Sequence, residues 1–232
     1  MTDLDEHQKW LLENGTFIFD WDGTLFDSMD TKKANFVAIV SNYLKKLDII
    51  SDQKILNDIY VSLSGNPRSE IIEKMLTQFG LNIDSSIYET LDSALFNLNK
   101  SNLEKCILFP DTLRLLDRLT EHKRKVCISS SVPQSELDYF FQLVVPSEYK
   151  HTFDAVLGGA EQFKKGEPHF SFILSNSKIK RPQFLFIGDD CSDVEIGRES
   201  GISSILIDRS EKNLCRTPVP TIRSLDLICA LK

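Results

Sequence analysis

The stretch that decides the fold is residues 17–25, which read Phe-Ile-Phe-Asp-Trp-Asp-Gly-Thr-Leu. A short continuous apolar run such as its first three residues is typical of a strand that is buried on both faces of a sheet. Two carboxylates follow at once, at Asp20 and Asp22, and Gly23 allows the backbone to turn away sharply. Acids at the end of a buried strand indicate a polar site there, although a plain surface turn would explain this pair equally well.

Four more apolar runs of the same kind follow along the chain, and each one ends in small or acidic residues. Helical patterns separate the runs, for example at residues 112–119 and 136–143. The five predicted strands are residues 16–19, 125–128, 153–157, 184–187 and 204–207. Strands that alternate with helices predict an α/β fold with a doubly wound parallel sheet.

Residues 30–105 break this alternation. Their apolar side chains recur at the spacing of a helix, as at Phe36, Val40 and Leu44, and they show no convincing strand. We therefore expect a second, smaller all-helical domain over residues 30–105, inserted into a core domain of residues 1–29 and 106–232. An insertion at this point would sit above the carboxyl ends of the strands, where open α/β sheets bind ligands.

The composition excludes some classes of function. The chain has 232 residues, with 34 acidic residues against 27 Lys and Arg and a net charge of −7, whereas a nucleic-acid-binding protein needs a basic surface. The first residues are acidic rather than basic, and no apolar stretch has membrane-spanning length, so we expect a cytoplasmic protein that binds neither nucleic acid nor membrane. The five cysteines, an odd number, are expected to be reduced thiols.

The pair of carboxylates suits phosphoryl transfer. Asp20 would act as the nucleophile and form an aspartyl-phosphate, which divides one difficult hydrolysis into two easier steps. Asp22 would give a proton to the leaving oxygen and later take one from water.

Three other strand ends add residues that fit this chemistry. The second predicted strand ends at Ser129, whose hydroxyl and following amide can bind phosphate oxygens. Lys165 lies in the loop after the third strand, where a cation can neutralise charge on the nucleophile and the phosphate. Residues 188–193, Gly-Asp-Asp-Cys-Ser-Asp, follow the fourth strand, and clustered acids of this kind suit Mg²⁺. Alone, each of these could be a turn, a solvated surface or a helix cap.

Together the four sites form an ordered set: Asp-x-Asp-Gly-Thr, then Ser, then Lys, then Gly-Asp-x-x-x-Asp. This set resembles the motifs of the haloacid dehalogenase (HAD) superfamily, and the resemblance covers residues 16–208, including a helical insertion after the first motif. It implies a Rossmann-like sheet in which the first and fourth strands are neighbours. The position of the insertion is similar to that of the cap domain in phosphoglycolate phosphatases and β-phosphoglucomutases.

The resemblance also implies a set of ligands for Mg²⁺. The metal would be held by the Asp20 carboxylate, the Asp22 backbone carbonyl and Asp189. Asp193 would act through water or by orienting Lys165.

The same resemblance implies how the phosphoryl group is held. Ser129 and Lys165 would bind it, together with backbone amides near Trp21, Asp22 and Ser130.

The third motif departs from the family pattern. Relatives often have Lys-Pro-x-Pro, whereas this chain has Lys-Gly-Glu-Pro at residues 165–168. The position of Pro168 favours Lys165 as the functional lysine, with Lys164 as the alternative. His169, which follows, is expected to be structural.

Asp22 separates the chemistries that the family performs. In the family that this chain resembles, members with dehalogenase, phosphonate-cleaving or ion-pumping activity lack an acid two residues after the nucleophile. An acid here favours phosphate esters, so we expect a magnesium-dependent phosphomonoester hydrolase that acts on a small phosphorylated metabolite. A phosphosugar mutase of the β-phosphoglucomutase type and a catalytically degenerate binding protein are the alternatives; a receiver-like phospho-acceptor would be about half this length and would lack Asp22.

Specificity is expected to lie in the helical insertion. Residues 64–68, Ser-Gly-Asn-Pro-Arg, form its one turn that carries a cation. We hypothesise that Arg68 contacts the distal polar groups of the substrate as an anion clamp, although an exposed arginine at a helix start is an equally simple explanation. The identity of the substrate and the oligomeric state are left open.

Overall fold

The chain forms two compact units. The computed structural model describes residues 4–210 and 215–229. The first unit comprises Met1–Asp27 and Leu108–Lys232, and the second comprises Ser28–Ile107. The domain boundaries that were expected after residues 29 and 105 lie after residues 27 and 107.

The first unit is built on a six-stranded parallel sheet with the order β5-β4-β1-β6-β7-β8. Its strands are β1 (Thr16–Phe19), β4 (Val126–Pro133), β5 (Phe153–Gly159), β6 (Phe184–Gly188), β7 (Ser203–Ile207) and β8 (Thr221–Ile222). β1 pairs with β4 on one side and β6 on the other, so the expected neighbourhood of the first and fourth predicted strands is confirmed. Every residue of β6 is buried, as a strand covered on both faces requires.

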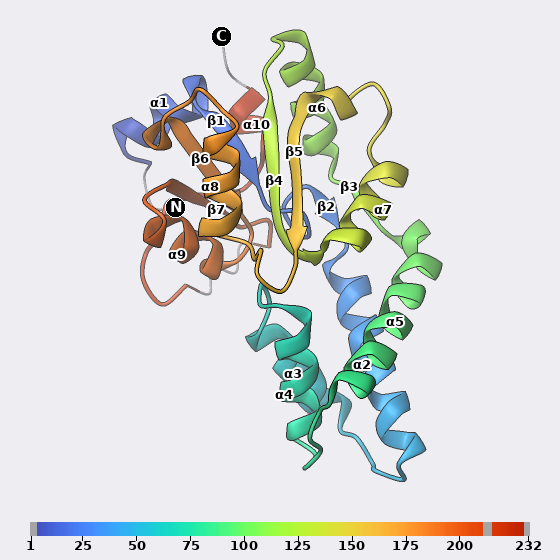
Figure 1. The fold of residues 1–232 in the computed structure, drawn as a ribbon. Helices are drawn as coiled ribbons and strands as arrows, with labels where there is room; N and C mark the ends of the chain where they lie inside the picture. The colour runs from blue at the N-terminus through green and yellow to red at the C-terminus, as the bar shows by residue number, and fades with distance from the viewer. Residues whose placement is uncertain (1–3, 211–214, 230–232) are drawn as a thin grey trace. The chain divides into compact units, whose positions relative to one another are not determined.

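Helices cover both faces of this sheet. They are α1 (Glu6–Asn14), α6 (Pro110–Glu121), α7 (Gln134–Val144), α8 (Glu167–Ser175), α9 (Cys191–Glu199) and α10 (Asp226–Cys229), with short 3₁₀ turns η2 (Lys150–Thr152) and η3 (Arg181–Gln183). α8 and α9 lie on one side of the sheet and α6 and α7 on the other (Figure 1). This distribution is what right-handed crossovers on either side of β1 produce. Among the described residues, no helix is both long enough and apolar enough to cross a membrane.

The core under α8 shows why these segments pack together. Phe170 of α8 and Phe186 of β6 are fully buried, and their rings meet edge to face with centroids 5.1 Å apart. The other buried members of this cluster are Ile18, Cys127, Leu157, Ile173, Phe184 and Ile202. Ile18 of β1 lies opposite Cys127 of β4 and Phe186 of β6, so α8 packs against side chains from one face of three adjacent strands.

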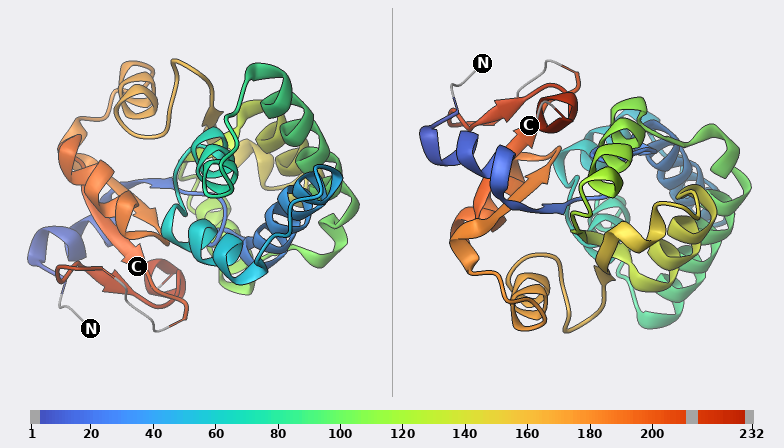
Figure 2. Two further views of the ribbon diagram at one scale, coloured as in Figure 1. Left: turned by 90° about the horizontal axis from the view of Figure 1, so that it is seen from below. Right: turned by 90° about the horizontal axis from the view of Figure 1, so that it is seen from above.

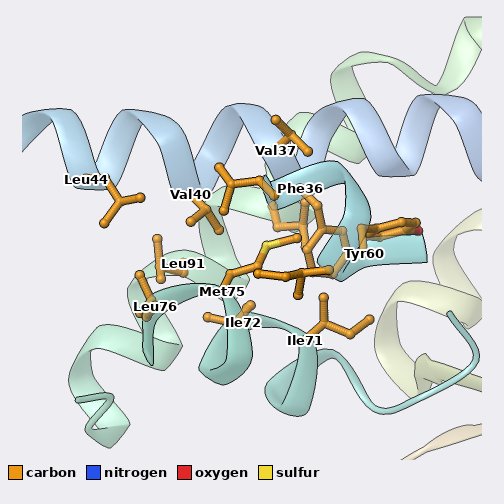
Figure 3. Packing of buried hydrophobic residues seen from close by; sticks show 13 residues of the cluster. Phe36, Val37, Val40, Leu44, Tyr60, Ile71, Ile72, Met75, Leu76 and Leu91 are labelled. Carbon is orange, nitrogen blue, oxygen red and sulfur yellow. The ribbon is translucent and has the colours of Figure 1, made fainter. Parts of the chain in front are cut away.

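The second unit is all-helical. Its helices are α2 (Met29–Lys46), α3 (Gln53–Ser62), α4 (Arg68–Thr77) and α5 (Ser85–Ser101), followed by a 3₁₀ turn, η1 (Leu103–Lys105). α2 and α5 lie side by side (Figure 1; Figure 2). α2 buries Phe36, Val37, Val40 and Leu44, a helical spacing that places all four on one face. Figure 3 shows these side chains meeting Tyr60 of α3, Met75 of α4 and Leu91 of α5 in a single apolar core.

Three short strands were not predicted. β2 (Phe26–Asp27) and β3 (Ile107–Leu108) form a separate two-stranded sheet. β8 extends the main sheet at its edge. Each of them has only two residues, which is too short for any alternation of apolar and polar side chains to be visible in the sequence.

β4 is longer than predicted, because it continues through the serines at 129–131 to Pro133 with an irregular register against β5. Two glycines of β5 make this possible. A Cβ atom at Gly158 would lie 2.7 Å from the Val132 carbonyl oxygen, and one at Gly159 would lie 3.0 Å from that of Ser131. Only residues without a side chain allow the two backbones to approach so closely.

The expectation that the cysteines are reduced is wrong for two of them. Cys191, the first residue of α9, forms a disulfide with Cys215. Cys106 and Cys127 are free, whereas the side chain of Cys229 lies outside the described residues. The pairing was missed because the two residues are 24 positions apart and become neighbours only when the chain returns from β7 to the start of α9.

Candidate active site

The site begins where β1 ends. The Asp20 N–H donates to the Ile187 carbonyl at 2.9 Å and so continues the pairing with β6 by one residue. The chain then turns back on itself, because the N–H groups of Leu25 and Phe26 both donate to the Trp21 carbonyl at 3.0 Å. Asp20 is thereby held at the carboxyl edge of the sheet, at the end of β1. The strand order changes direction at β1, and ligands usually bind at this point of such sheets.

Gly23 is required in this turn for two reasons. Its φ of +73° lies in the left-handed region, and a Cβ atom at this position would overlap the Asp189 carboxylate. Glycine therefore permits both the turn after β1 and the approach of Asp189 to it.

The two residues that follow Asp20, Trp21 and Asp22, have different surroundings. The indole of Trp21 is fully buried against Phe26 and Phe141, with ring centroids 5.1 and 6.3 Å away. What Trp21 offers to the site is therefore its backbone amide, which hydrogen-bonds Asp20. Asp22 is half-buried and forms a bridge with Phe26 within the turn.

Lys165 connects the first and fourth motifs. Its Nζ lies 3.1 Å from Asp20 Oδ2 and also forms an ion pair with Asp193. Its side chain is 4% exposed, whereas Lys164 is exposed to solvent. Of the two lysines considered from the sequence, Lys165 is the one that the structure brings to Asp20.

The acids of the fourth motif have different roles. Asp190 is the N-cap of α9 and accepts a hydrogen bond from the Ser192 N–H at 2.9 Å, so it serves the helix. Asp193, one turn into α9, turns back toward the strand end. Carboxylate oxygens of Asp20, Asp189 and Asp193 all lie within 4.8 Å of one another.

Burial and crowding shift the pKa values of these acids. Burial raises the pKa of Asp20 to about 7, with further repulsion from Asp193 and Asp22, and Lys165 only partly offsets this. Burial, with the neighbouring charges of Asp20 and Asp193, raises the pKa of Asp189 well above its usual range. Burial opposes the charge of Lys165, but the carboxylates of Asp193 and Asp20 raise its pKa overall. One ammonium group thus lies among three carboxyl groups and forms ion pairs with two of them, Asp20 and Asp193.

This charge imbalance fits a divalent cation. The three carboxylates form an all-oxygen donor set, which is what Mg²⁺ prefers. A second positive charge among them would favour the ionised form of each acid and lower the raised pKa values. The residues present therefore fit the metal that the motifs implied.

The serines of the second motif lie on the other side of β1. The Ser129 side chain is fully buried, and its Oγ lies 2.9 Å from Nδ1 of His169 in α8. Ser130 is also buried, and its Oγ accepts a hydrogen bond from the Val132 N–H at 3.3 Å.

Two residues to which the sequence patterns assigned no role, Thr24 of the first motif and Arg209, hold that motif in place. Thr24 Oγ1 donates to Asp189 Oδ1 at 3.3 Å and so ties the turn to the fourth motif. Arg209, just after β7, donates from Nη2 to the Thr24 carbonyl at 2.7 Å and from Nη1 to Asp111 Oδ2 at 2.8 Å. Its guanidinium also lies 3.8 Å from the centre of the Phe109 ring. A lone arginine after a strand carries no recognisable motif, so only its contacts identify this role.

Arg68 lies in the second unit. It is the first residue of α4, and its Nη1 donates to Asp92 Oδ1 of α5 at 2.7 Å. Its charge is thus partly neutralised within that unit.

Comparison with known proteins agrees with these motifs. Residues 17–207 match the family model described as Haloacid dehalogenase-like hydrolase. A phosphoglycolate phosphatase of Rhodobacter capsulatus is 24% identical over 193 residues, which cover 82% of each chain.

Solved structures share the fold. A HAD phosphatase from Thermococcus onnurineus superposes with a TM-score of 0.64 at 18% identity, covering 91% of this chain and 94% of the other. A HAD-hydrolase from Bacillus subtilis, crystallised with bound magnesium, gives a TM-score of 0.65 at 16% identity, covering 92% and 96%. At these identities the likeness establishes the fold.

Proposed function

The chain belongs to the haloacid dehalogenase-like hydrolases and is a phosphatase of that family, and from this premise we propose that it is a magnesium-dependent phosphomonoester hydrolase that works through an aspartyl-phosphate on Asp20. The observation that carries the proposal is the buried cluster in which Asp20 meets Lys165, Asp189 and Asp193. Small phosphorylated metabolites are the proposed substrates, and the phosphoglycolate phosphatase among the relatives supports this class.

Mg²⁺ would be held by the carboxylates of Asp20 and Asp189 and by the Asp22 backbone carbonyl, with Asp193 acting through water or on Lys165. When bound, it supplies positive charge that offsets the developing charge on the transferring phosphoryl group. Two features of the chain support this role: the raised pKa values of Asp20 and Asp189, and the presence of one lysine beside three acids, two of which it pairs with.

Each residue of the site has its own proposed role in the reaction. Asp20 attacks phosphorus through a carboxylate oxygen, and the P–O bond to the leaving alkoxide breaks as the new bond forms. Asp22 gives its proton to that alkoxide and then accepts one from the water that hydrolyses the aspartyl-phosphate. Lys165 neutralises charge on the nucleophile and the phosphoryl oxygens. Ser129 and the backbone amides near Trp21, Asp22 and Ser130 position those oxygens.

The first test is turnover of an aryl phosphate. Asp20→Asn is expected to lower kcat by about 10⁴-fold or more, since a nucleophile has no substitute. Asp190→Asn is the matched control, because asparagine keeps the N-cap of α9 while one negative charge is lost. If Asp20→Asn and chelation of Mg²⁺ both leave turnover intact, the mechanism is wrong. In the wild type, acid quenching during turnover should trap phosphate on the peptide that contains Asp20.

A second test addresses Asp22. Asp22→Asn should lower the hydrolysis of alkyl phosphates by about 10²- to 10⁴-fold, the usual contribution of a general acid. Aryl phosphates should be affected less in the step that forms the aspartyl-phosphate, because a phenolate leaves without a proton donor. Equal losses on both substrates would argue against Asp22 as the acid. Transfer of phosphate to a sugar phosphate in place of its release would favour the mutase alternative.

Arg68 is proposed as a contact for the distal polar groups of the substrate. Its pairing with Asp92 supports this, because a paired guanidinium is held in one orientation. Arg68→Ala should raise KM for the best metabolite in a panel while leaving the turnover of a small aryl phosphate near the wild-type value. An unchanged profile across the panel would refute the contact.

A further inference from the structure

His169 is a buried histidine that the mechanism above does not use. It lies in the first turn of α8, its side chain is inaccessible to solvent, and its ring packs against that of Phe163 at a tilt of 45°, with centroids 4.6 Å apart. One ring nitrogen, Nδ1, lies 2.9 Å from Ser129 Oγ, and the other, Nε2, lies 3.3 Å from the Phe163 carbonyl oxygen. The residue therefore contacts the proposed phosphate-binding serine directly.

The two hydrogen bonds of the ring nitrogens indicate where its proton is. A neutral imidazole has one N–H and one acceptor nitrogen. A carbonyl oxygen can only accept, so the nitrogen that faces Phe163 must carry the hydrogen. Nδ1 is then the acceptor, and the Ser129 hydroxyl must donate to it. Burial lowers the pKa of His169 to about 4 against the opposing effect of backbone hydrogen bonds at Phe163 and Gly158, and the charge of Lys165 adds to the lowering, so the ring is neutral near pH 7.

This arrangement has a consequence for phosphate binding. A serine hydroxyl has one proton, and phosphoryl oxygens require donors. While Ser129 donates to His169, it presents only lone pairs to the site. It can hold a phosphoryl oxygen only by turning its proton away from His169, and a charged acceptor is the stronger partner for that proton.

Resting on the function proposed above, we propose that His169 is a positioning residue that holds the Ser129 hydroxyl proton in the free enzyme and competes with the phosphoryl group for it. Binding of a phosphoryl group turns the Ser129 proton from His169 Nδ1 to a phosphoryl oxygen. His169 thereby weakens the binding of free phosphate, the product, by roughly the value of one neutral hydrogen bond.

The first experiment is ¹⁵N NMR of histidine-labelled protein. The chain has four histidines, and His7, His122 and His151 are exposed. A triple variant with glutamine at these three positions keeps His169 as the single signal, and it should retain wild-type activity. The free protein should show the Nε2–H tautomer, and saturation with inorganic phosphate and Mg²⁺ should shift the Nδ1 resonance to that of a nitrogen without a hydrogen-bond donor. An Nδ1–H tautomer in the free protein, or an unmoved Nδ1 resonance in the complex, would overturn the inference.

The second experiment is a double-mutant cycle on the affinity for inorganic phosphate. His169→Leu removes the competing acceptor, so phosphate should bind about fivefold more tightly. Ser129→Ala should then weaken phosphate binding about fivefold more in the leucine background than in the wild type. A merely structural role of His169 predicts weaker binding in His169→Leu and equal effects of Ser129→Ala in both backgrounds, and that result would overturn the inference.

The two proposals can fail separately. Measuring the His169 tautomer in the free protein requires neither catalysis nor a folded His169→Leu variant. It therefore tests the direction of the His169–Ser129 hydrogen bond even in a preparation without activity. Failure to hydrolyse aryl phosphates while phosphate still binds and moves the Nδ1 resonance would count against the proposed function alone.

Discussion

The apolar interior of the second unit and the cluster beside Asp20 in the first unit contain opposite kinds of side chain. The second unit encloses thirteen hydrophobic residues contributed by all four of its helices. Beside Asp20, the first unit instead buries Asp193 at 1% exposure and Lys165 at 4%. Apolar burial stabilises a fold by about 25 cal/mol per Å², whereas buried charges cost free energy unless they are fully compensated.

This contrast separates stability from function. The apolar interior of the second unit needs nothing further, because each side chain already has its partners. The polar interior beside Asp20 has three carboxyl groups and one lysine, so a cation would complete it. We therefore expect changes beside Asp20 to affect activity and metal response, and changes in the second unit's core to affect stability alone.

Among the changes that test this contrast, the largest expected effect comes from removing the lysine. Lys165→Met should lower kcat/KM for an aryl phosphate by roughly 10²- to 10³-fold, because charge on the phosphoryl oxygens loses its partner. Without added Mg²⁺, the free energy of unfolding should fall by about 3–5 kcal/mol, since Asp20 and Asp193 are left buried without a counter-charge. Lys164→Met, at the exposed neighbouring position, is the control and should change neither quantity. If both variants behave alike, the charge cluster is not as described.

The apolar interior can be broken at Met75. Its side chain is fully buried in the cluster of Figure 3, so Met75→Ala should lower the free energy of unfolding by about 2–5 kcal/mol in denaturant titrations. Val61→Ala, at a position of the same unit that is 54% exposed, should change it little. The affinity for Mg²⁺ should be the same in both variants, because Asp20, Asp189 and Asp193 all belong to the first unit. A loss of metal affinity in Met75→Ala would contradict the separation.

A third prediction uses the buried histidine. The pKa of His169 is lowered from its usual 6.5 to about 4, so between these values the unfolded chain takes up a proton that the folded chain refuses. Its contribution to stability is therefore complete above pH 6.5 and falls by up to about 3 kcal/mol as the pH drops to 4. Unfolding free energies measured from pH 7 to pH 4 should fall less steeply in His169→Leu. His122→Gln, at an exposed position, should keep the wild-type slope.

The disulfide is expected to affect stability by about as much as the histidine. The bond between Cys191 and Cys215 closes a loop across 24 positions, so its reduction should lower the free energy of unfolding by about 3 kcal/mol in the chain-entropy model. Cys215→Ser should show the same loss and no further response to reductant. Cys106→Ser, which removes a free thiol, should leave the response to reductant intact.

Much of the architecture was predictable from local patterns. The five longer strands and the helical character of residues 30–105 followed from the spacing of apolar residues, because a strand or helix must place its apolar side chains on the faces that it buries. The order of Asp20, Ser129, Lys165 and Asp189 along the chain was visible as well, since each follows a predicted strand and parallel strands end at one edge of a sheet.

Other features depend on contacts between residues that are far apart in the chain. Arg209 reaches the Thr24 carbonyl, His169 meets Ser129, and Cys191 pairs with Cys215, and in none of these does either residue carry a local signal of its partner. The raised pKa of Asp20 likewise required knowledge of how many carboxyl groups share the one ammonium of Lys165. Periodicity reports which face of an element is buried, but hydrogen bonds and charge interactions act over a few ångströms in space, so they are defined only when the folded chain brings the partners together.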